Sequence, residues 1–134
     1  MIALDTNVLV RFLVDDDRRQ ADIANELINY SGGVFIARTV LLELEWVLRQ
    51  VYQFDPKTIA AGLLSLLGLP TVTVESPGHV AQALRDYAKG MDFADALHLA
   101  SNVGGGLLYT FDKRFAKSAT ANRATLASRK SIPI

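Results

Sequence analysis

The chain has 134 residues, of which 50% are hydrophobic and 21% charged, so we expect one folded domain over residues 1–134 rather than a disordered segment. It contains no cysteine, which excludes disulfides, zinc–thiolate sites and a thiol nucleophile. The sequence shows neither a secretion signal at its start nor an uncharged apolar run of membrane-spanning length. We therefore expect a cytoplasmic protein with no membrane contact.

The formal net charge is zero, but the charges are unevenly distributed. Residues 1–111 carry 8 basic and 13 acidic residues, whereas residues 112–134 carry 6 basic and 1 acidic residue. The acidic part suggests clustered carboxylates, and the basic tail suits a phosphate backbone, for which Lys113, Arg114 and Lys117 are the nearest candidate contacts. Taken alone, the asymmetry favours ordinary surface solubility as its explanation.

Hydrophobic periodicity predicts alternating strands and helices along the chain. The strands are expected at residues 2–4, 34–37, 71–74 and 107–110, and the helices at 8–13, 18–30, 40–52, 56–67, 78–89 and 93–103. Strands separated by helices favour right-handed crossovers, and therefore an α/β fold in which a small parallel sheet is flanked by helices on both faces. Residues 118–134 have the weakest pattern, and we expect a helix and a short edge strand there.

Two aspartates directly follow predicted strands. Asp5 comes after the strand at 2–4, and Asp112 after the strand at 107–110. Ligand sites in parallel sheets gather at the carboxyl ends of the strands, so we expect both carboxylates at one sheet edge. Taken singly, Asp5 is also typical of a helix N-cap and Asp112 of a turn. Their matched placement favours a shared site.

The helix predicted at 40–52 carries two glutamates in different settings. On a helical wheel Glu43 borders the hydrophobic stripe, whereas Glu45 points away from it and is expected to be solvated. A carboxylate in an apolar setting needs a cation or a hydrogen-bond donor, so we interpret Glu43 as a site residue. Leu42 and Trp46 lie beyond the stripe, which indicates a contact with another chain or with another helix of the domain.

Asp92 and Asp95 stand at the start of the helix predicted at 93–103, where the helix dipole favours anions. A capping aspartate with a second acid three residues later is also a common purely structural pattern. Asp92 suits the cap better, which leaves Asp95 to face a site. Both histidines, His79 and His98, lie in predicted helices without a paired serine or cysteine motif, and we interpret them as structural.

Four inward carboxylates would repel one another strongly, so such a cluster requires divalent cations. Mg²⁺ or Mn²⁺ is the expected cofactor, because both ions prefer carboxylate and water oxygens. One ion, or a pair, can activate water and stabilise the leaving oxygen when a phosphodiester bond is cleaved. The number of ions stays open.

Together these segments resemble a known family. The sequences LDTNVL at 4–9, LLEL followed by WVLR within 41–49, DFADA at 92–96 and TFDKRF at 110–115 are similar to those of the PIN-domain ribonucleases, in particular the toxin component of VapBC-type toxin–antitoxin modules. The resemblance covers most of the chain but does not extend clearly over residues 118–134.

The resemblance implies a function and a set of site residues. It implies a metal-dependent endoribonuclease with Asp5, Glu43, Asp95 and Asp112 as catalytic, metal-binding acids and Asp92 as a candidate fifth acid. By the same resemblance, Asn7 and Thr110 are polar neighbours that orient carboxylates, water or metal. The implied partners are an RNA substrate, a second copy in a homodimer, and a small antitoxin protein whose tail enters the acidic pocket.

Two other functions remain open from the residues alone. Asp5 after a first strand would suit an aspartyl-phosphate phosphoryl-transfer domain, although Asn7 stands where the most familiar version of that chemistry has a second aspartate. Alternatively, the acids bind a cation or a basic partner segment without catalysis. A trapped phosphoaspartate at Asp5 would favour the first alternative, and absence of metal-dependent RNA cleavage would favour the second.

Overall fold

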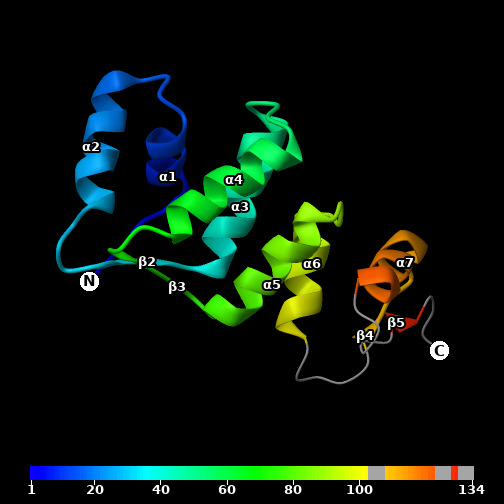
Figure 1. Cartoon of the computed structure of the whole chain (residues 1–134). Helices are drawn as coiled ribbons and strands as arrows, with labels where there is room; N and C mark the ends of the chain where they lie inside the picture. Colours follow the sequence, from blue (N-terminus) through cyan, green and yellow to red (C-terminus); the bar gives the residue numbers. More distant parts are fainter. Residues whose placement is uncertain (103–107, 123–127, 130–134) are drawn as a thin grey trace. The chain divides into compact units, whose positions relative to one another are not determined.

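The structure, a computed structural model, describes residues 1–102, 108–122 and 128–129 (Figure 1). The chain divides into two compact units, Met1–Pro77 and Gly78–Ile134, and each is described by itself. Among the described residues, no helix is long and apolar enough to span a membrane.

The first unit is built on a three-stranded parallel sheet in the order β1-β2-β3. Its elements in chain order are β1 (Ile2–Ala3), α1 (Thr6–Leu13), α2 (Arg18–Ile28), β2 (Val34–Ile36), α3 (Arg38–Gln50), α4 (Pro56–Leu67) and β3 (Val72–Val74). Both crossovers contain two helices and advance in the same direction across the sheet. Right-handed connections therefore place all four helices on one face, as Figure 1 shows.

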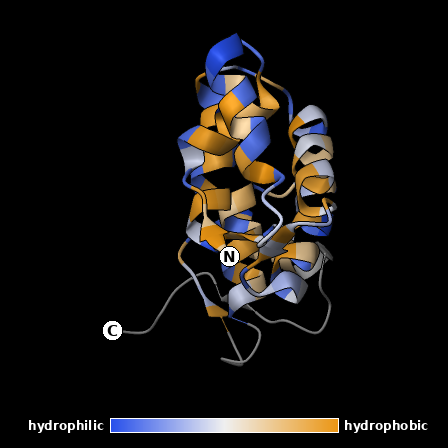
Figure 2. Ribbon diagram, turned by 90° about the vertical axis from the view of Figure 1, so that its left-hand side faces the viewer, coloured by the Kyte–Doolittle hydropathy of each residue, from blue (hydrophilic) through white to orange (hydrophobic). Residues whose placement is uncertain are grey.

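The core of the first unit lies between this sheet and its helices. Val34 and Ile36 of β2 are fully buried, as are Leu9, Leu44 and Leu63 of three of the helices. Figure 2 shows hydrophobic residues running along the helices in stripes rather than covering them. Burial of these stripes against the sheet is the main stabilisation of such short strands and helices, because isolated helices of this length are marginal in water.

Most helices of the first unit begin at an aspartate. Asp17 accepts a hydrogen bond from the backbone N–H of Gln20 at 3.1 Å, and Asp55 accepts one from Thr58 at 2.8 Å. Pro56 follows Asp55 at the first helical position, where its missing N–H costs nothing. Helix α3 is different, because its N-cap residue Ala37 has no side-chain hydrogen bond to offer.

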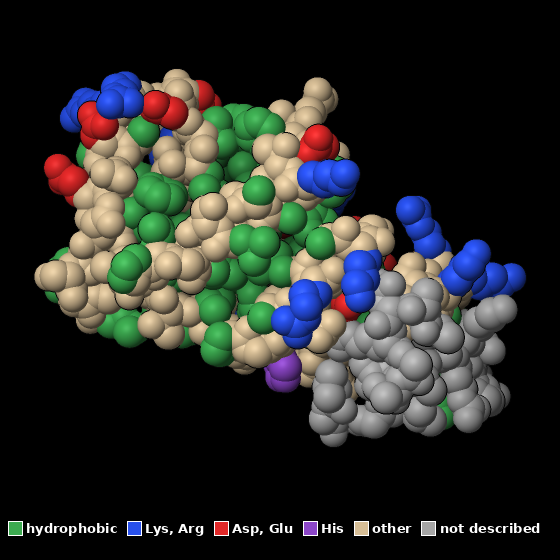
Figure 3. Space-filling model, viewed as in Figure 1, with side chains coloured by type: hydrophobic (Ala, Val, Ile, Leu, Met, Phe, Trp, Pro, Cys, Tyr) green, Lys and Arg blue, Asp and Glu red, His purple; other side chains and the backbone are tan. Residues whose placement is uncertain are grey.

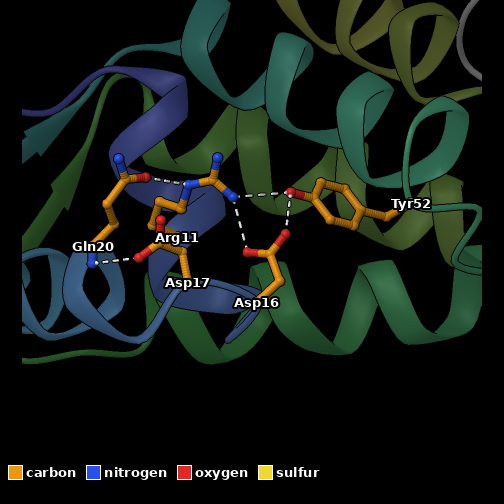
Figure 4. Close-up of polar contacts among 5 residues, drawn as sticks. All are labelled: Arg11, Asp16, Asp17, Gln20 and Tyr52. Carbon is orange, nitrogen blue, oxygen red and sulfur yellow. Dashed lines mark hydrogen bonds and ion pairs between the residues drawn. The ribbon is translucent and has the colours of Figure 1, made fainter.

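A polar network ties the end of α1 to α2 and to the residues after α3 (Figure 4). The Arg11 guanidinium donates to Gln20 Oε1 at 2.6 Å, to Asp16 Oδ1 at 2.8 Å and to the Tyr52 hydroxyl at 3.2 Å. Tyr52 in turn donates to Asp16 Oδ2 at 3.0 Å. Burial alone would raise the pKa of Asp16, but the hydrogen bonds from Tyr52 and Arg11 outweigh it and lower that pKa.

The second unit contains α5 (Pro77–Ala88), which begins at the last residue of the first unit, followed by α6 (Phe93–Ser101), β4 (Leu108–Tyr109), α7 (Lys113–Asn122) and β5 (Ser128–Arg129). Gly90 ends the turn after α5 with a φ of 103°, a conformation that favours glycine. Tyr87 and Phe93 then pack edge to face, with ring centroids 5.3 Å apart. These contacts fix the start of α6.

The predicted α/β class with a parallel sheet is confirmed, and the elements fall within a few residues of their predicted bounds. The expectation that all the predicted strands belong to one sheet is wrong. Strand β4 pairs with β5 in a separate parallel sheet, with Leu108 opposite Ser128, so strand pairing does not put Asp5 and Asp112 at one sheet edge. The partner strand comes from the C-terminal segment whose sequence pattern was weakest. Helices on the second face of the first sheet stay a prediction.

Candidate active site

In the first unit, Asp5 stands at the carboxyl end of β1 and is the N-cap of α1. Its Oδ1 accepts a hydrogen bond from the Val8 N–H at 3.3 Å, and its side chain is exposed. Asn7, in the first turn of α1, is exposed as well. The capping role predicted for Asp5 is therefore confirmed. One carboxylate oxygen is engaged in the cap, which still leaves acceptor capacity for a ligand.

The structure corrects the assignment of the two glutamates of α3. Glu43 is exposed, whereas Glu45 is only 2% exposed and lies in the buried stripe with Leu41, Leu44 and Leu48. The prediction that Glu45 is the solvated residue is wrong, because Arg49 one turn later donates to Glu45 Oε2 at 2.8 Å and compensates its charge. Burial therefore gives no support to a site role for Glu43, which depends on the family resemblance.

A further acid, which the sequence patterns did not single out, lies at the same edge of the sheet. Glu75 directly follows β3, and its N–H donates to the Ile36 carbonyl at 2.9 Å. Its Oε1 accepts from the backbone N–H of Arg38 at 2.9 Å, and its Oε2 lies 3.6 Å from the Arg38 guanidinium. The only sequence signal was its position after a β-branched strand, which is the signal that singled out Asp5.

In the second unit, Asp92 and Asp95 occupy the start of α6. Asp92 is the N-cap, and its Oδ2 accepts from the Asp95 N–H at 3.1 Å. Asp92 is exposed, and Asp95 is half-buried. The prediction that Asp92 is the cap is therefore confirmed, and the Asp95 carboxylate is a separate group beside it.

Asp112 stands between β4 and α7. Its Oδ1 accepts from the Phe115 N–H at 3.0 Å, and its own N–H donates to the Thr110 hydroxyl at 3.0 Å. Thr110 thus fixes the backbone of an acidic residue, and its role in orienting carboxylates, water or metal stays a prediction. Three basic side chains follow Asp112 on α7, where Figure 3 shows basic side chains gathered, and all three are exposed: Lys113, Arg114 and Lys117.

The carboxylates of the second unit influence one another. The pKa of Asp95 is raised, first by burial and then by the negative charges of Asp92 and Asp112, while His98 and Arg114 partly offset the effect. Three of the predicted acids therefore share one electrostatic environment. His98 also belongs to it, although sequence analysis interpreted it as a structural residue.

These oxygens fit a hard divalent cation chemically. Carboxylates are the preferred ligands of Mg²⁺ and Mn²⁺, and a cation would relieve the repulsion that Asp95 experiences. Within the described residues no three acidic or histidine side chains form a ready metal-binding group. Asp5 and Glu43 belong to one unit and Asp95 and Asp112 to the other, so the convergence of all four stays a prediction.

A pocket of about 410 Å³ opens between α1 and α2. It begins at Asn7, two residues from Asp5, and its walls combine four apolar with three polar side chains: Val8, Ile23, Ala24 and Leu27, and Asn7, Arg11 and Gln20. Ile23 is 50% exposed, so the pocket presents apolar surface to solvent beside a candidate site residue.

The fold and these residues define a class of protein. An α/β fold with short parallel strands, each candidate acid placed after a strand or in a helix, is typical of a site with oxygen ligands rather than a nucleophile triad. The chain belongs to the PIN domain family, whose model matches residues 2–120 and so spans all four predicted acids. This is a nuclease family, generally metal-dependent. No curated protein gives a significant match to the chain.

Proposed function

We propose that this protein is a Mg²⁺- or Mn²⁺-dependent endoribonuclease, with Asp5, Glu43, Asp95 and Asp112 forming one catalytic centre. The observation that carries the proposal is the PIN domain match over residues 2–120. The effect of the Asp112 charge on the pKa of Asp95 supports it, because two of the four acids then lie within electrostatic reach of each other.

The residues have separate tasks in this centre. Asp5, Glu43, Asp95 and Asp112 would hold the metal through their carboxylate oxygens. A bound divalent cation supplies an activated water and neutralises charge on the scissile phosphate. Thr110 fixes the backbone at Asp112, and the exposed basic side chains that follow Asp112 suit the phosphate backbone of RNA.

The direct test is cleavage of labelled structured RNA with Mg²⁺ or Mn²⁺, and with EDTA. We expect cleavage with either metal, none with EDTA, and a loss of at least about 100-fold in Asp5→Asn, since even residues that merely support metal ligands cost up to that much. Asp22→Asn is the matched control, because Asp22 is an exposed acid on α2 paired with Arg18, and it should retain full activity.

A clean preparation that cleaves no RNA with either metal would contradict the proposed nuclease. Such a result would favour a domain that binds a cation or a basic segment without catalysis. If Asp22→Asn lost as much activity as Asp5→Asn, the loss would reflect the removal of any negative charge from the surface. It would then not identify Asp5 as a residue of the active site.

We further propose that the nuclease is the toxin of a toxin–antitoxin module, forms a homodimer and is silenced by a small antitoxin. The family resemblance carries this finer assignment. Two surfaces support partner binding: Trp46 on α3 is 53% exposed, and the pocket between α1 and α2 adjoins Asn7. An inhibitory tail with a basic side chain would pair with the site carboxylates and compete with metal.

A further inference from the structure

The register of the first sheet places Asp5, Ala37 and Glu75 side by side. Ile2 lies opposite Val34 and Ile36 opposite Val74. The same parallel alignment continues past the strands, because Leu4 N–H donates to the Phe35 carbonyl and Glu75 N–H to the Ile36 carbonyl. Asp5 and Glu75 therefore follow the two strands that flank β2, β1 and β3. Their backbones lie roughly 10 Å apart, which is two strand spacings.

Helix α3 begins at this same edge without a cap of its own. The first backbone N–H groups of a helix lack partners within the helix, and Ala37 provides no side-chain acceptor. Glu75 supplies the acceptor from a different strand, at 2.9 Å from the Arg38 nitrogen, and pairs with the Arg38 guanidinium as well. A carboxylate at a helix N-terminus is also favoured by the helix dipole.

Oε1 of Glu75 accepts from the Arg38 N–H, and Oε2 forms an ion pair with the Arg38 guanidinium at 3.6 Å, so both contacts of this carboxylate are with Arg38. These contacts join the end of β3 to the start of α3. Glu43 lies five residues into α3, about 7.5 Å along the helix axis from Arg38. A shift of α3 at its start therefore carries Glu43 with it and changes the position of this carboxylate relative to Asp5.

We propose that Glu75 is a positioning residue of the nuclease centre: from the end of β3 it caps α3 at Arg38 and thereby holds Glu43 in place at the edge of the sheet that carries Asp5. This inference rests on the proposed function. It assigns to Glu75 a role through the backbone of α3, without contact with metal or RNA.

The test compares Glu75→Ala, Glu75→Gln and Asp55→Ala in the full chain. Glu75→Ala removes the cap and the charge, whereas Glu75→Gln keeps an oxygen that accepts from the Arg38 N–H but removes the charge. Asp55→Ala is the matched control, because it removes a carboxylate cap with a similar hydrogen-bond length, 2.8 Å, from α4, a helix that carries none of the proposed site residues. Circular dichroism and thermal unfolding confirm that each variant is folded.

Three quantities are measured: amide hydrogen exchange at Arg38, Mn²⁺ affinity by calorimetry, and kcat and KM for RNA at varied Mg²⁺. For Glu75→Ala we expect faster exchange at Arg38, Mn²⁺ affinity weaker by about 10-fold or more, as for other groups that orient metal ligands, and a lower kcat with little change in KM. Glu75→Gln should stay close to the wild type in all three. Asp55→Ala should bind Mn²⁺ normally despite its lost cap.

Wild-type Mn²⁺ affinity in Glu75→Ala would overturn the positioning role. An equal loss in Glu75→Gln would overturn it too, because charge rather than the cap would then be responsible, and so would an equal loss in Asp55→Ala, which would mean a general effect of stability. If the wild type binds Mn²⁺ but cleaves no RNA, the proposed nuclease activity is overturned. The positioning role of Glu75 is then tested by Mn²⁺ affinity and amide hydrogen exchange alone. A wild type that binds no metal overturns both.

Discussion

Asp112, just before α7, lies close enough to Asp95, in the first turn of α6, for its negative charge to raise the pKa of Asp95. Burial of Asp95 is the larger cause, and Asp92 contributes in the same direction. The second unit therefore brings together two acids that are distant in the sequence, at a cost in electrostatic repulsion. Like charges held close together despite their repulsion are typical of functional sites.

The first prediction concerns stability without metal. The folded pKa of Asp95 lies above its ordinary value of 3.8, so the folded chain binds this proton more tightly than the unfolded chain. The stability that this proton contributes is present below the unfolded pKa and is lost as pH rises through the folded pKa. Asp95→Asn removes the ionised form, so in EDTA at pH 7 it should have a higher Tm than the wild type.

This gain should shrink as the pH falls through the folded pKa of Asp95, because protonation of the wild-type carboxyl group removes the same charge. Thermal unfolding at several pH values measures it. Asp22→Asn, at an exposed position, serves as the control for the loss of one carboxylate. A Tm difference between Asp95→Asn and the wild type that is absent at pH 7, or constant from pH 7 to pH 4, would contradict the prediction.

The second prediction tests whether acids of both units act in one centre. Asp5→Asn and Asp112→Asn should each lower RNA cleavage by at least about 100-fold. Residues that act as a unit show strongly non-additive losses, so the double variant should be only slightly less active than either single variant. Cleavage rates at saturating Mg²⁺ provide the measurement. Losses that multiply in the double variant would place the two residues in independent roles.

Sequence analysis predicted the α/β class because hydrophobic periodicity is a local signal that short strands and amphipathic helices both carry. It predicted the caps Asp5 and Asp92 for the same reason, since a cap depends on residues within one turn. It failed at Glu45, because the buried stripe of α3 runs through that position and Arg49 compensates the charge. The Glu45–Arg49 spacing of four residues was the available signal.

Contacts between segments that are distant in the sequence could not be predicted from these local patterns. The capping of α3 by Glu75 joins residues 37 positions apart, and no local rule connects them. The pairing of β4 with β5 was missed for a similar reason, because two-residue strands have too few side chains to show a period. Register and strand order are properties of the folded chain.

The third prediction concerns the basic side chains at the start of α7. If Lys113, Arg114 and Lys117 contact phosphates, replacing all three with Gln should weaken RNA binding and reduce the salt dependence of log Kd by about 0.7 per lost contact with single-stranded RNA. Binding is measured in an Asp5→Asn background, which prevents cleavage, over a range of KCl concentrations.

A triple Gln variant at Lys57, Arg85 and Lys89 provides the matched control, because these side chains are also exposed and carry the same charge. It should change the salt dependence much less. Equal changes in the two triple variants would mean that RNA responds only to net charge, and the basic side chains of α7 would then be ordinary surface.

The fourth prediction uses the network at the end of α1. The pKa of Asp16 is lowered by Tyr52 and Arg11 against the opposing effect of burial, so the network stabilises the fold above the unfolded pKa of Asp16 and loses this effect as pH falls through the folded pKa. Tyr52→Phe removes the hydroxyl that joins both partners. It should lower the Tm at pH 7, by less at pH 3, and leave RNA cleavage unchanged. A Tm deficit that is independent of pH would contradict this account.

The last prediction addresses the toxin assignment. Expression of this chain alone in bacteria should slow growth, because an unrestrained endoribonuclease depletes cellular RNA. Asp5→Asn should restore growth at the same protein level, since it removes a metal-binding carboxylate while its side-chain oxygen still accepts the Val8 N–H that caps α1. Growth curves, with immunoblots to equalise expression, provide the measurement, and Asp22→Asn should stay as toxic as the wild type.

A cognate antitoxin expressed beside the wild type should restore growth and co-purify with it, and excess Mn²⁺ should weaken that complex if a basic side chain of the antitoxin competes for the site carboxylates. Growth arrest by a soluble, folded Asp5→Asn protein would separate toxicity from nuclease chemistry and contradict the mechanism.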